Sequence, residues 1–182
     1  MTSYDAVTIS GSPSPLSKSG ALGEYARNFL EYAGLRTRGI SVRDLPAQDL
    51  FDGNRESDAI QYSLDLIQRA RAVVLLTPIY KSSYSGVLKT FIDLLPQDAL
   101  AGKVVLPVAL GGTSAQLVAA DYALKPVLAA LGARDVLGGI YAQESLIEWT
   151  EEKRLLLDPE LKTRLHGNLQ ALADAVLSRS LD

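Results

Sequence analysis

The residues best suited to chemistry are serines, glycines and tyrosines in three short segments, each of which follows an apolar run. The first segment spans Ser10–Gly20. Its Gly11 lets the backbone turn tightly and approach a ligand closely. Hydroxyls and free N–H groups at the start of a helix favour an anion, and the candidate donors here are Ser12, Ser17, Lys18 and Ser19. The segment therefore predicts a phosphate site, with an ordinary serine N-cap as the competing interpretation.

Two familiar phosphate motifs are missing from this first segment. It has neither the G-x-G-x-x-G spacing of dinucleotide-binding folds nor the G-x-x-x-x-G-K-[ST] spacing of a P-loop. A phosphate bound here would therefore be held by the serine hydroxyls, Lys18 and the helix N–H groups without either of these two motifs.

The second and third segments offer surfaces for a flat ligand. Pro78–Gly86 carries Tyr80 and Tyr84, whose rings and hydroxyls can lie against a planar molecule. Gly111-Gly112-Thr113 brings bare backbone close to whatever binds there, and its N–H groups can donate to a ligand carbonyl. For the second segment the alternative is that the tyrosines only cover the edge of the core. For the third segment the alternative is a plain turn between a strand and a helix.

Composition excludes several classes of function. The 182 residues include no cysteine and one histidine, with a formal net charge of −3. Thiolate chemistry and disulfides are excluded, and a multi-histidine metal centre or a nucleic-acid partner is disfavoured. No membrane-spanning apolar run or secretory signal is recognisable. We therefore expect a metal-free protein of the cytoplasm with no membrane or nucleic-acid partner.

Apolar runs alternate with helical patterns along the chain. The expected strands are 6–10, 36–42, 72–77, 103–110 and 135–141, and the expected helices are 20–33, 57–70, 85–94, 115–131 and 159–178. Five such units predict an α/β fold in one domain spanning residues 1–182, with helices on both faces of a doubly wound, five-stranded parallel sheet. With strand order 2-1-3-4-5, the three segments converge at the carboxyl ends of the strands, where ligands bind in such sheets.

These segments resemble a known family. The stretches Ser10–Ser19, Thr77–Pro96 and Gly111–Thr113 are similar to those of the flavodoxin-like NADPH-dependent FMN reductases. Asp121–Leu128 resembles one branch, the reductase component of two-component alkanesulfonate monooxygenase systems. The resemblance implies a flavodoxin-like fold and NADPH-dependent reduction of FMN for a partner flavin-dependent monooxygenase.

The resemblance also implies roles for individual residues. Ser12, Ser17 and Ser19 would hold the FMN phosphate, and Lys18 could replace an arginine that many relatives carry where this chain has Ser14. The isoalloxazine and ribityl chain would lie against residues of the second segment, namely Pro78, Ile79, Tyr80, Lys81, Tyr84, Ser85 and Gly86. Gly111, Gly112 and Thr113 would reach the pyrimidine edge of the flavin.

Branch membership implies a role for Tyr122 as well. In the branch a tyrosine at this place sits in a π-type bulge near the flavin and at the interface of a homo-oligomer, a dimer or more often a tetramer. A helical tyrosine on an apolar face is more commonly plain core or interface. Pro126 makes a local irregularity plausible on physical grounds, because it lacks an N–H donor.

Other functions and residues stay open at this level. A flavodoxin-type electron carrier that keeps its FMN, and a quinone, azo or chromate reductase, would share the fold. His166 is expected to be solvated, and the charged run 148–154 to form a solvated segment. Trp149 is a candidate interface anchor or cover for an apolar patch, with no assigned function.

Overall fold

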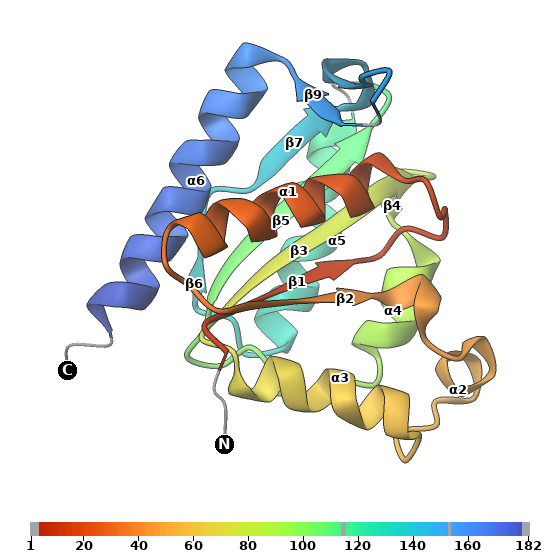
Figure 1. Ribbon diagram of the computed structural model, residues 1–182. Coiled ribbons are helices and arrows are strands. Elements are labelled where there is room, and N and C mark those ends of the chain that lie inside the picture. Colours follow the sequence, from red (N-terminus) through yellow and green to blue (C-terminus); the bar gives the residue numbers. More distant parts are fainter. Residues whose placement is uncertain (1–3, 114–115, 153, 180–182) are drawn as a thin grey trace.

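The computed structural model describes residues 4–113, 116–152 and 154–179, with only the backbone described for 116–120. Its centre is a mostly parallel sheet (Figure 1). The strands on its main path are β1 (Ala6–Ser10), β2 (Thr37–Ser41), β3 (Ala72–Tyr80), β5 (Val104–Gly111) and β6 (Asp135–Val136). Their order is β2-β1-β3-β5-β6, so the predicted order 2-1-3-4-5 is confirmed once the parallel strands are counted in sequence.

Helices cover both faces of the sheet, as predicted (Figure 1). One face carries α1 (Lys18–Tyr32) and α6 (Pro159–Ser178). The other carries α3 (Asp58–Arg69), α4 (Gly86–Ile92) and α5 (Gln116–Ala130). A short helix, α2 (Ala47–Asp52), and two 3-10 turns, η1 (Val42–Asp44) and η2 (Glu144–Leu146), complete the helical elements of the described residues.

The core follows from the period of the strands. Successive side chains of a strand point to opposite faces. In β3, Val74 and Leu76 pack with α1 and α6, whereas Val73 and Leu75 pack with α3, α4 and α5. Strands buried on both faces have nearly continuous apolar sequences, which is why β3 and β5 are recognisable in the sequence.

The fifth parallel strand differs from the expectation. The predicted run 135–141 is divided into β6 and β7 (Ile140–Gln143). On β5, Val105 pairs with Val136 of β6 and Val108 pairs with Ile140 of β7. Three steps along β5 thus match four steps along the neighbouring chain, which contains one extra residue. Pro107 of β5 lies at the break and has no N–H to donate to the neighbouring strand. The interruption is a bulge that the Gly138-Gly139 pair accommodates.

The segment after β3 is a tight hairpin rather than an open loop. β4 (Ser83–Tyr84) returns antiparallel to β3, pairing Ile79 with Tyr84 and Tyr80 with Ser83. The two connecting residues, Lys81 and Ser82, have φ values of 49° and 63°. A two-residue turn of this kind normally uses asparagine or glycine, so the sequence gives no sign of it.

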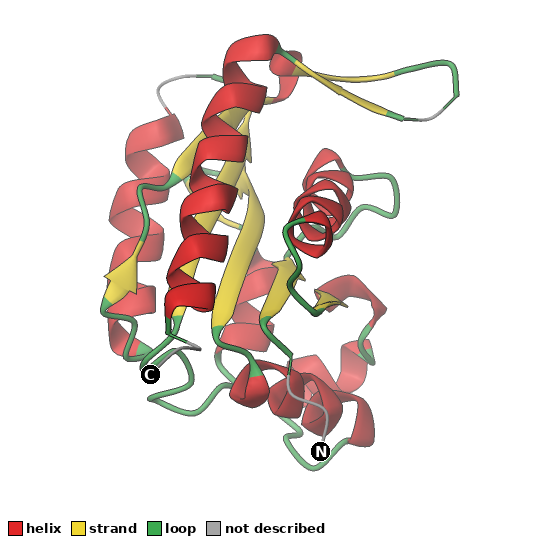
Figure 2. Cartoon of the chain, turned by 60° about the vertical axis from the view of Figure 1, so that its left-hand side comes forward, coloured by secondary structure: helices red, strands yellow, loops and turns green. Residues whose placement is uncertain are grey.

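A second hairpin was not expected at all. β8 (Ile147–Trp149) and β9 (Leu155–Leu157) pair antiparallel, and the run 148–154 that was expected to form a solvated segment covers the end of β8 and the connection to β9. Figure 2 shows this ribbon extending away from the sheet. Within the described residues, no helix combines the length and the apolar character needed to cross a bilayer.

Candidate functional site

The first loop prepares the start of α1 for an anion. Ser17 is the N-cap, and its Oγ accepts from the N–H of Gly20 at 2.9 Å and from the hydroxyl of Ser19 at 3.4 Å. No acidic side chain lies in the first turn. The N–H groups of Lys18 and Ser19 precede the first intrahelical bond, so they remain available to a ligand. A phosphate at this position meets N–H and hydroxyl donors together with the positive end of the helix dipole.

The first loop is locked to the second. The N–H of Gly11 donates to the Leu76 carbonyl at 2.8 Å, and the Gly11 carbonyl accepts from the Ser85 hydroxyl. Ser85 is also the N-cap of α4, where it accepts from Leu88 N–H at 3.0 Å. A Cβ at position 11 would lie 2.5 Å from Leu88 Cβ. Glycine is therefore required because α4 approaches the loop backbone directly.

A pocket of about 270 Å³, here the loop pocket, opens beside the first loop. Six predicted residues line it: Ser12, Ser17, Lys18, Ser19, Pro78 and Tyr80. Five others complete the lining: Ser14, Leu16, Leu110, Glu144 and Trp149. The structure thus brings together residues from the ends of β1, β3 and β5, as the strand order predicts. The C-terminal contribution to this lining was not foreseen.

Lys18 has a partner within the protein that the sequence did not indicate. Its Nζ donates to the carbonyl oxygen of Glu144 at 2.5 Å, across 126 positions of sequence. Both Lys18 and Glu144 line the loop pocket. Lys18 therefore ties the start of α1 to the segment preceding the β8–β9 hairpin while keeping a positive charge beside the first loop.

The remaining predicted residues of the second segment do not line the loop pocket but lie in or next to the strands and helix that form it. Ile79 is buried with Ala109 and Tyr141, whereas Lys81 is exposed in the tight turn. Tyr84 is half-buried in β4, and burial raises the pKa of its hydroxyl, which stays protonated at neutral pH. Ser85 is 1% exposed and holds the two loops together, and Gly86 starts α4 in open space.

The third segment lies at the end of β5. Gly111 is buried and pairs with Gln143, while Gly112 and Thr113 are exposed. The Thr113 carbonyl accepts a hydrogen bond from the Tyr141 hydroxyl, which pins the turn. A Cβ at Gly112 would meet nothing within 4 Å, so the space beside it is open. Ser114, which follows, lies outside the described residues.

Tyr122 lies outside the loop pocket. It sits on α5 with 79% of its surface exposed, and α5 packs beside β4. The expected π-type bulge is wrong for the described backbone, because Gln116–Ala130 is a continuous α-helix. Pro126 is accommodated inside this helix at the loss of one N–H donor, without a change of helical type.

His166 was expected to be solvated, and that expectation is wrong. The histidine is half-buried against α1, where its Nε2 lies 2.7 Å from the Tyr25 hydroxyl and its ring lies 4.8 Å from that of Phe29. Burial, with a smaller contribution from Lys162, lowers the pKa of His166. The signal that could have found this contact is the spacing of Leu161, Leu165 and Leu169, which places His166 at the margin of the buried face of α6.

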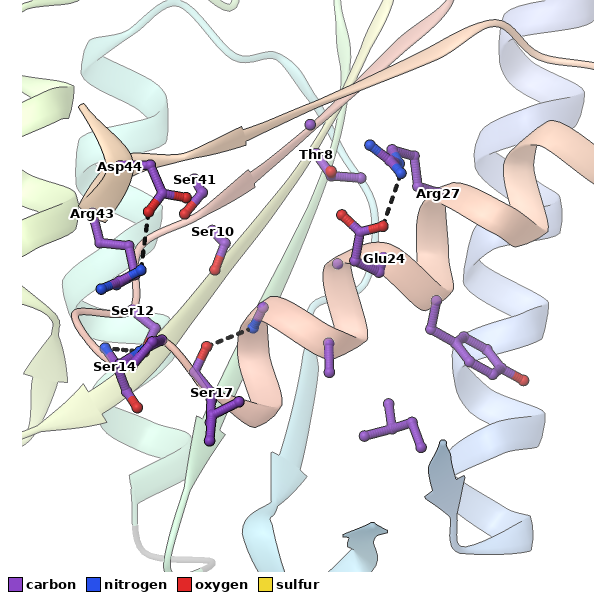
Figure 3. Close-up of a pocket in the computed structure, with 18 of the residues that line it drawn as sticks. Thr8, Ser10, Ser12, Ser14, Ser17, Glu24, Arg27, Ser41, Arg43 and Asp44 are labelled. Carbon is purple, nitrogen blue, oxygen red and sulfur yellow. Dashed lines mark hydrogen bonds and ion pairs between the residues drawn. The ribbon is translucent and has the colours of Figure 1, made fainter. Parts of the chain in front are cut away.

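A larger hollow of about 690 Å³, here the helix groove, continues on the other side of the first loop. Its sheet-side wall includes Thr8, Ser10 and Ser41, and Thr8 lies near Arg27 and Glu24 of α1 (Figure 3). Arg27 pairs with Glu24 at 2.8 Å and Arg43 with Asp44 at 2.9 Å, which offsets the positive charge. A third arginine of the lining, Arg154, pairs with Glu152 outside the groove at 3.8 Å, so the groove is polar with three arginines and two carboxylates in its lining.

Comparison with known proteins identifies the family. A family model, NADPH-dependent FMN reductase, matches residues 5–145. The chain belongs to this family. The FMN reductase (NADPH) of Pseudomonas putida is 44% identical over 174 residues, covering 95% of this chain and 88% of the relative. The corresponding enzyme of Escherichia coli K12 is 41% identical over 176 residues, covering 96% and 91%.

A solved structure agrees with this assignment. The NADH:FMN oxidoreductase EMOB superimposes with a TM-score of 0.85 at 35% identity, covering 94% of this chain and 89% of EMOB. The predicted flavodoxin-like fold and family are thus confirmed. This chain is an oxidoreductase of the FMN reductase class, and its ligands are FMN and NADPH.

The loop pocket of this reductase fits FMN by the chemistry of its donors. The phosphate end of FMN needs N–H and hydroxyl groups, and the start of α1 supplies them with no acidic side chain in its first turn, although Glu144 also lines the pocket. The flat end needs apolar and aromatic surface, which Pro78, Tyr80 and Leu110 offer. The resemblance therefore agrees with the geometry at the phosphate loop.

Proposed function

We propose that this reductase treats FMN as an exchangeable substrate and releases reduced FMN to a separate flavin-dependent monooxygenase of the alkanesulfonate type. The observation that carries the exchange is the make-up of the loop pocket. Its described lining contains no arginine, and its one lysine already donates to a backbone carbonyl. Phosphate held by hydroxyls and N–H groups is bound without the charge-assisted bidentate contacts that favour long retention.

The chain's contribution to the reaction is binding and orientation. Bound FMN supplies the hydride-accepting chemistry, with NADPH as donor. We assign phosphate binding to Ser12, Ser17, Lys18 and Ser19. For the flavin ring and ribityl chain we assign Pro78, Ile79, Tyr80, Lys81, Tyr84, Ser85 and Gly86, with Gly111, Gly112 and Thr113 at the pyrimidine edge. Holding the nicotinamide and flavin rings against each other makes hydride transfer effectively unimolecular, and this positioning is the main source of the rate acceleration.

The similarity of Asp121–Leu128 to the alkanesulfonate branch supports the monooxygenase partner. A cytoplasmic location, where NADPH is supplied, accompanies this proposal. Tyr122, exposed on α5 beside β4, is proposed to lie at a homo-oligomer interface close to the flavin. Light scattering tests the oligomer: a monomer at micromolar concentration would contradict it.

Exchange is tested by two measurements on the purified protein. Gel filtration after saturation with FMN is expected to remove most of the flavin. NADPH oxidation is then expected to rise with added FMN until saturation. One flavin retained per chain, with no stimulation by added FMN, would instead identify an electron carrier. Comparing FMN with menadione and an azo dye as acceptors tests the broader reductase alternatives on the same preparation.

Delivery to the partner has its own readout. An alkanesulfonate monooxygenase mixed with this reductase, NADPH, FMN and an alkanesulfonate is expected to release sulfite. Omitting the reductase should abolish the release, and photoreduced FMN should restore it. Sulfite release restored by photoreduced FMN but not by the reductase would contradict the partner assignment while leaving FMN reduction intact.

A further inference from the structure

The β8–β9 hairpin has an inner and an outer face. Ile147 pairs with Leu157, and Trp149 pairs with Leu155. Ile147 is fully buried and Leu157 is 7% exposed, both in the core beneath α1 and α6. Because side chains on a strand alternate, Trp149 and Leu155 share this inner face. Glu148 and Leu156 therefore lie on the outer face.

The core ends before it reaches Trp149. The indole keeps 43% of its surface exposed although it belongs to the inner face. Trp149 lines both the loop pocket and the helix groove, and Ser12, Ser14, Leu16 and Ser17 line both as well. The part of the inner face that carries Trp149 is thus beside the first loop.

Two hydrogen bonds close the hairpin itself, and a third ties the residues before it to α1. The N–H of Asp158 donates to the Leu146 carbonyl at 2.9 Å, closing the base of the ribbon. Thr150 N–H donates to the Arg154 carbonyl at 2.9 Å, closing the other end. Lys18 ties the preceding residue Glu144 to the start of α1. The indole is therefore placed against the first loop by the fold itself.

We propose that Trp149 contacts bound FMN beside the first loop and that the β8–β9 hairpin forms the outer wall of the flavin site. This inference rests on the proposed function, which places FMN in the loop pocket. An indole that is half-exposed at the wall of a pocket gains buried apolar area and ring contacts when a flat ligand arrives. Packing of FMN against Trp149 would thus supply part of the affinity that, in an arginine-lined pocket, would come from ion pairs with the phosphate.

The chain offers a matched set of variants. Trp149→Ala removes the ring, and Trp149→Phe keeps a smaller one. Leu156→Ala is the control, because Leu156 is 55% exposed on the outer face of the same hairpin and lines neither hollow. FMN affinity is measured by flavin absorbance on the full chain without NADPH. Thermal unfolding of each variant reports on the hairpin itself.

Trp149→Ala is expected to weaken FMN binding about tenfold, which corresponds to the loss of one aromatic contact. Trp149→Phe should weaken binding less than threefold, and Leu156→Ala should leave it unchanged. Since Trp149 is the only tryptophan in the chain, the wild-type protein gives one indole N–H resonance. That resonance is expected to shift on adding FMN and to stay in place on adding NADPH alone.

The outcomes separate this inference from the proposed function. If the wild type binds FMN but the indole resonance does not move, or Trp149→Ala binds FMN as tightly as wild type, the inference is overturned and the function stands. A change only in the KM for NADPH also overturns it. Failure of the wild type to bind or reduce FMN overturns the function. If Trp149→Ala does not fold, the wild-type resonance and Trp149→Phe decide.

Discussion

The two walls of the loop pocket are held in different ways. The first loop is tied to the second by hydrogen bonds through Gly11 and Ser85, both closely surrounded by protein. The C-terminal wall, from Glu144 to Trp149 together with His166 of α6, reaches α1 through hydrogen bonds of Lys18 with Glu144 and of Tyr25 with His166, and through the ring contact of Phe29 with His166. Packing of Ile147 and Leu157 supplies the rest. The first-loop wall is therefore the rigid one, held by hydrogen bonds, and the C-terminal wall is the packed one.

The largest expected effect comes from Gly11→Ala, which tests the rigid wall. The new Cβ would lie 2.5 Å from Leu88 Cβ and 3.1 Å from its Cγ, and the clashing Cβ is fixed to the backbone of α4. Overpacking of this kind is expected to cost about 3 kcal/mol. Urea unfolding measures it. FMN affinity should fall as well, because the loop must shift.

A matched control uses the same substitution where space is open. Gly167 lies inside α6, and a Cβ there meets nothing within 4 Å. Gly167→Ala is expected to stabilise the protein by up to about 1 kcal/mol, since glycine is a poor helix former. Equal effects of the two substitutions would contradict the close approach of α4 to the first loop.

Ser85→Ala is expected to have the second-largest effect. It removes the N-cap acceptor for Leu88 N–H and the donor to the Gly11 carbonyl. The expected loss is about 2 kcal/mol, combining a lost cap with a buried carbonyl left without its partner. Ser83→Ala in the same segment is the control, because its hydroxyl lies outside this network. A loss of stability no greater than that of Ser83→Ala would show that the two loops are held by other contacts.

The smallest effect concerns the packed wall and depends on pH. The folded pKa of His166 is lowered, chiefly by burial. The unfolded chain then binds the proton more readily, so the free energy of unfolding is unaffected well above about pH 6.5 and decreases as the pH falls below it. His166→Gln removes the titration and keeps a group that can bond Tyr25. The difference in Tm between pH 8 and pH 5.5 should be smaller in the variant; an identical difference would exclude His166 as the cause.

Much of the sheet and of the first loop could be predicted from the sequence. Two of these signals are local. A strand buried on both faces has a continuous apolar sequence, as in β1, β3 and β5. Helix capping involves residues within one turn, as at the serine-rich start of α1. The β3–β4 hairpin could not be predicted, since Lys81 and Ser82 are unusual residues for positive φ. The bulge between β6 and β7 depends on Pro107, which lies on another strand.

The sequence by itself determined the order of strands and helices, the donors at the start of α1, and the family through its motifs. Only the tertiary structure decided that Glu144 and Trp149 line the loop pocket beside the first loop, because Lys18 and Glu144, which are bonded there, lie 126 positions apart. Local patterns cannot report such a contact. It follows from how α6 and β7 pack on the sheet, which leaves the hairpin beside the first loop.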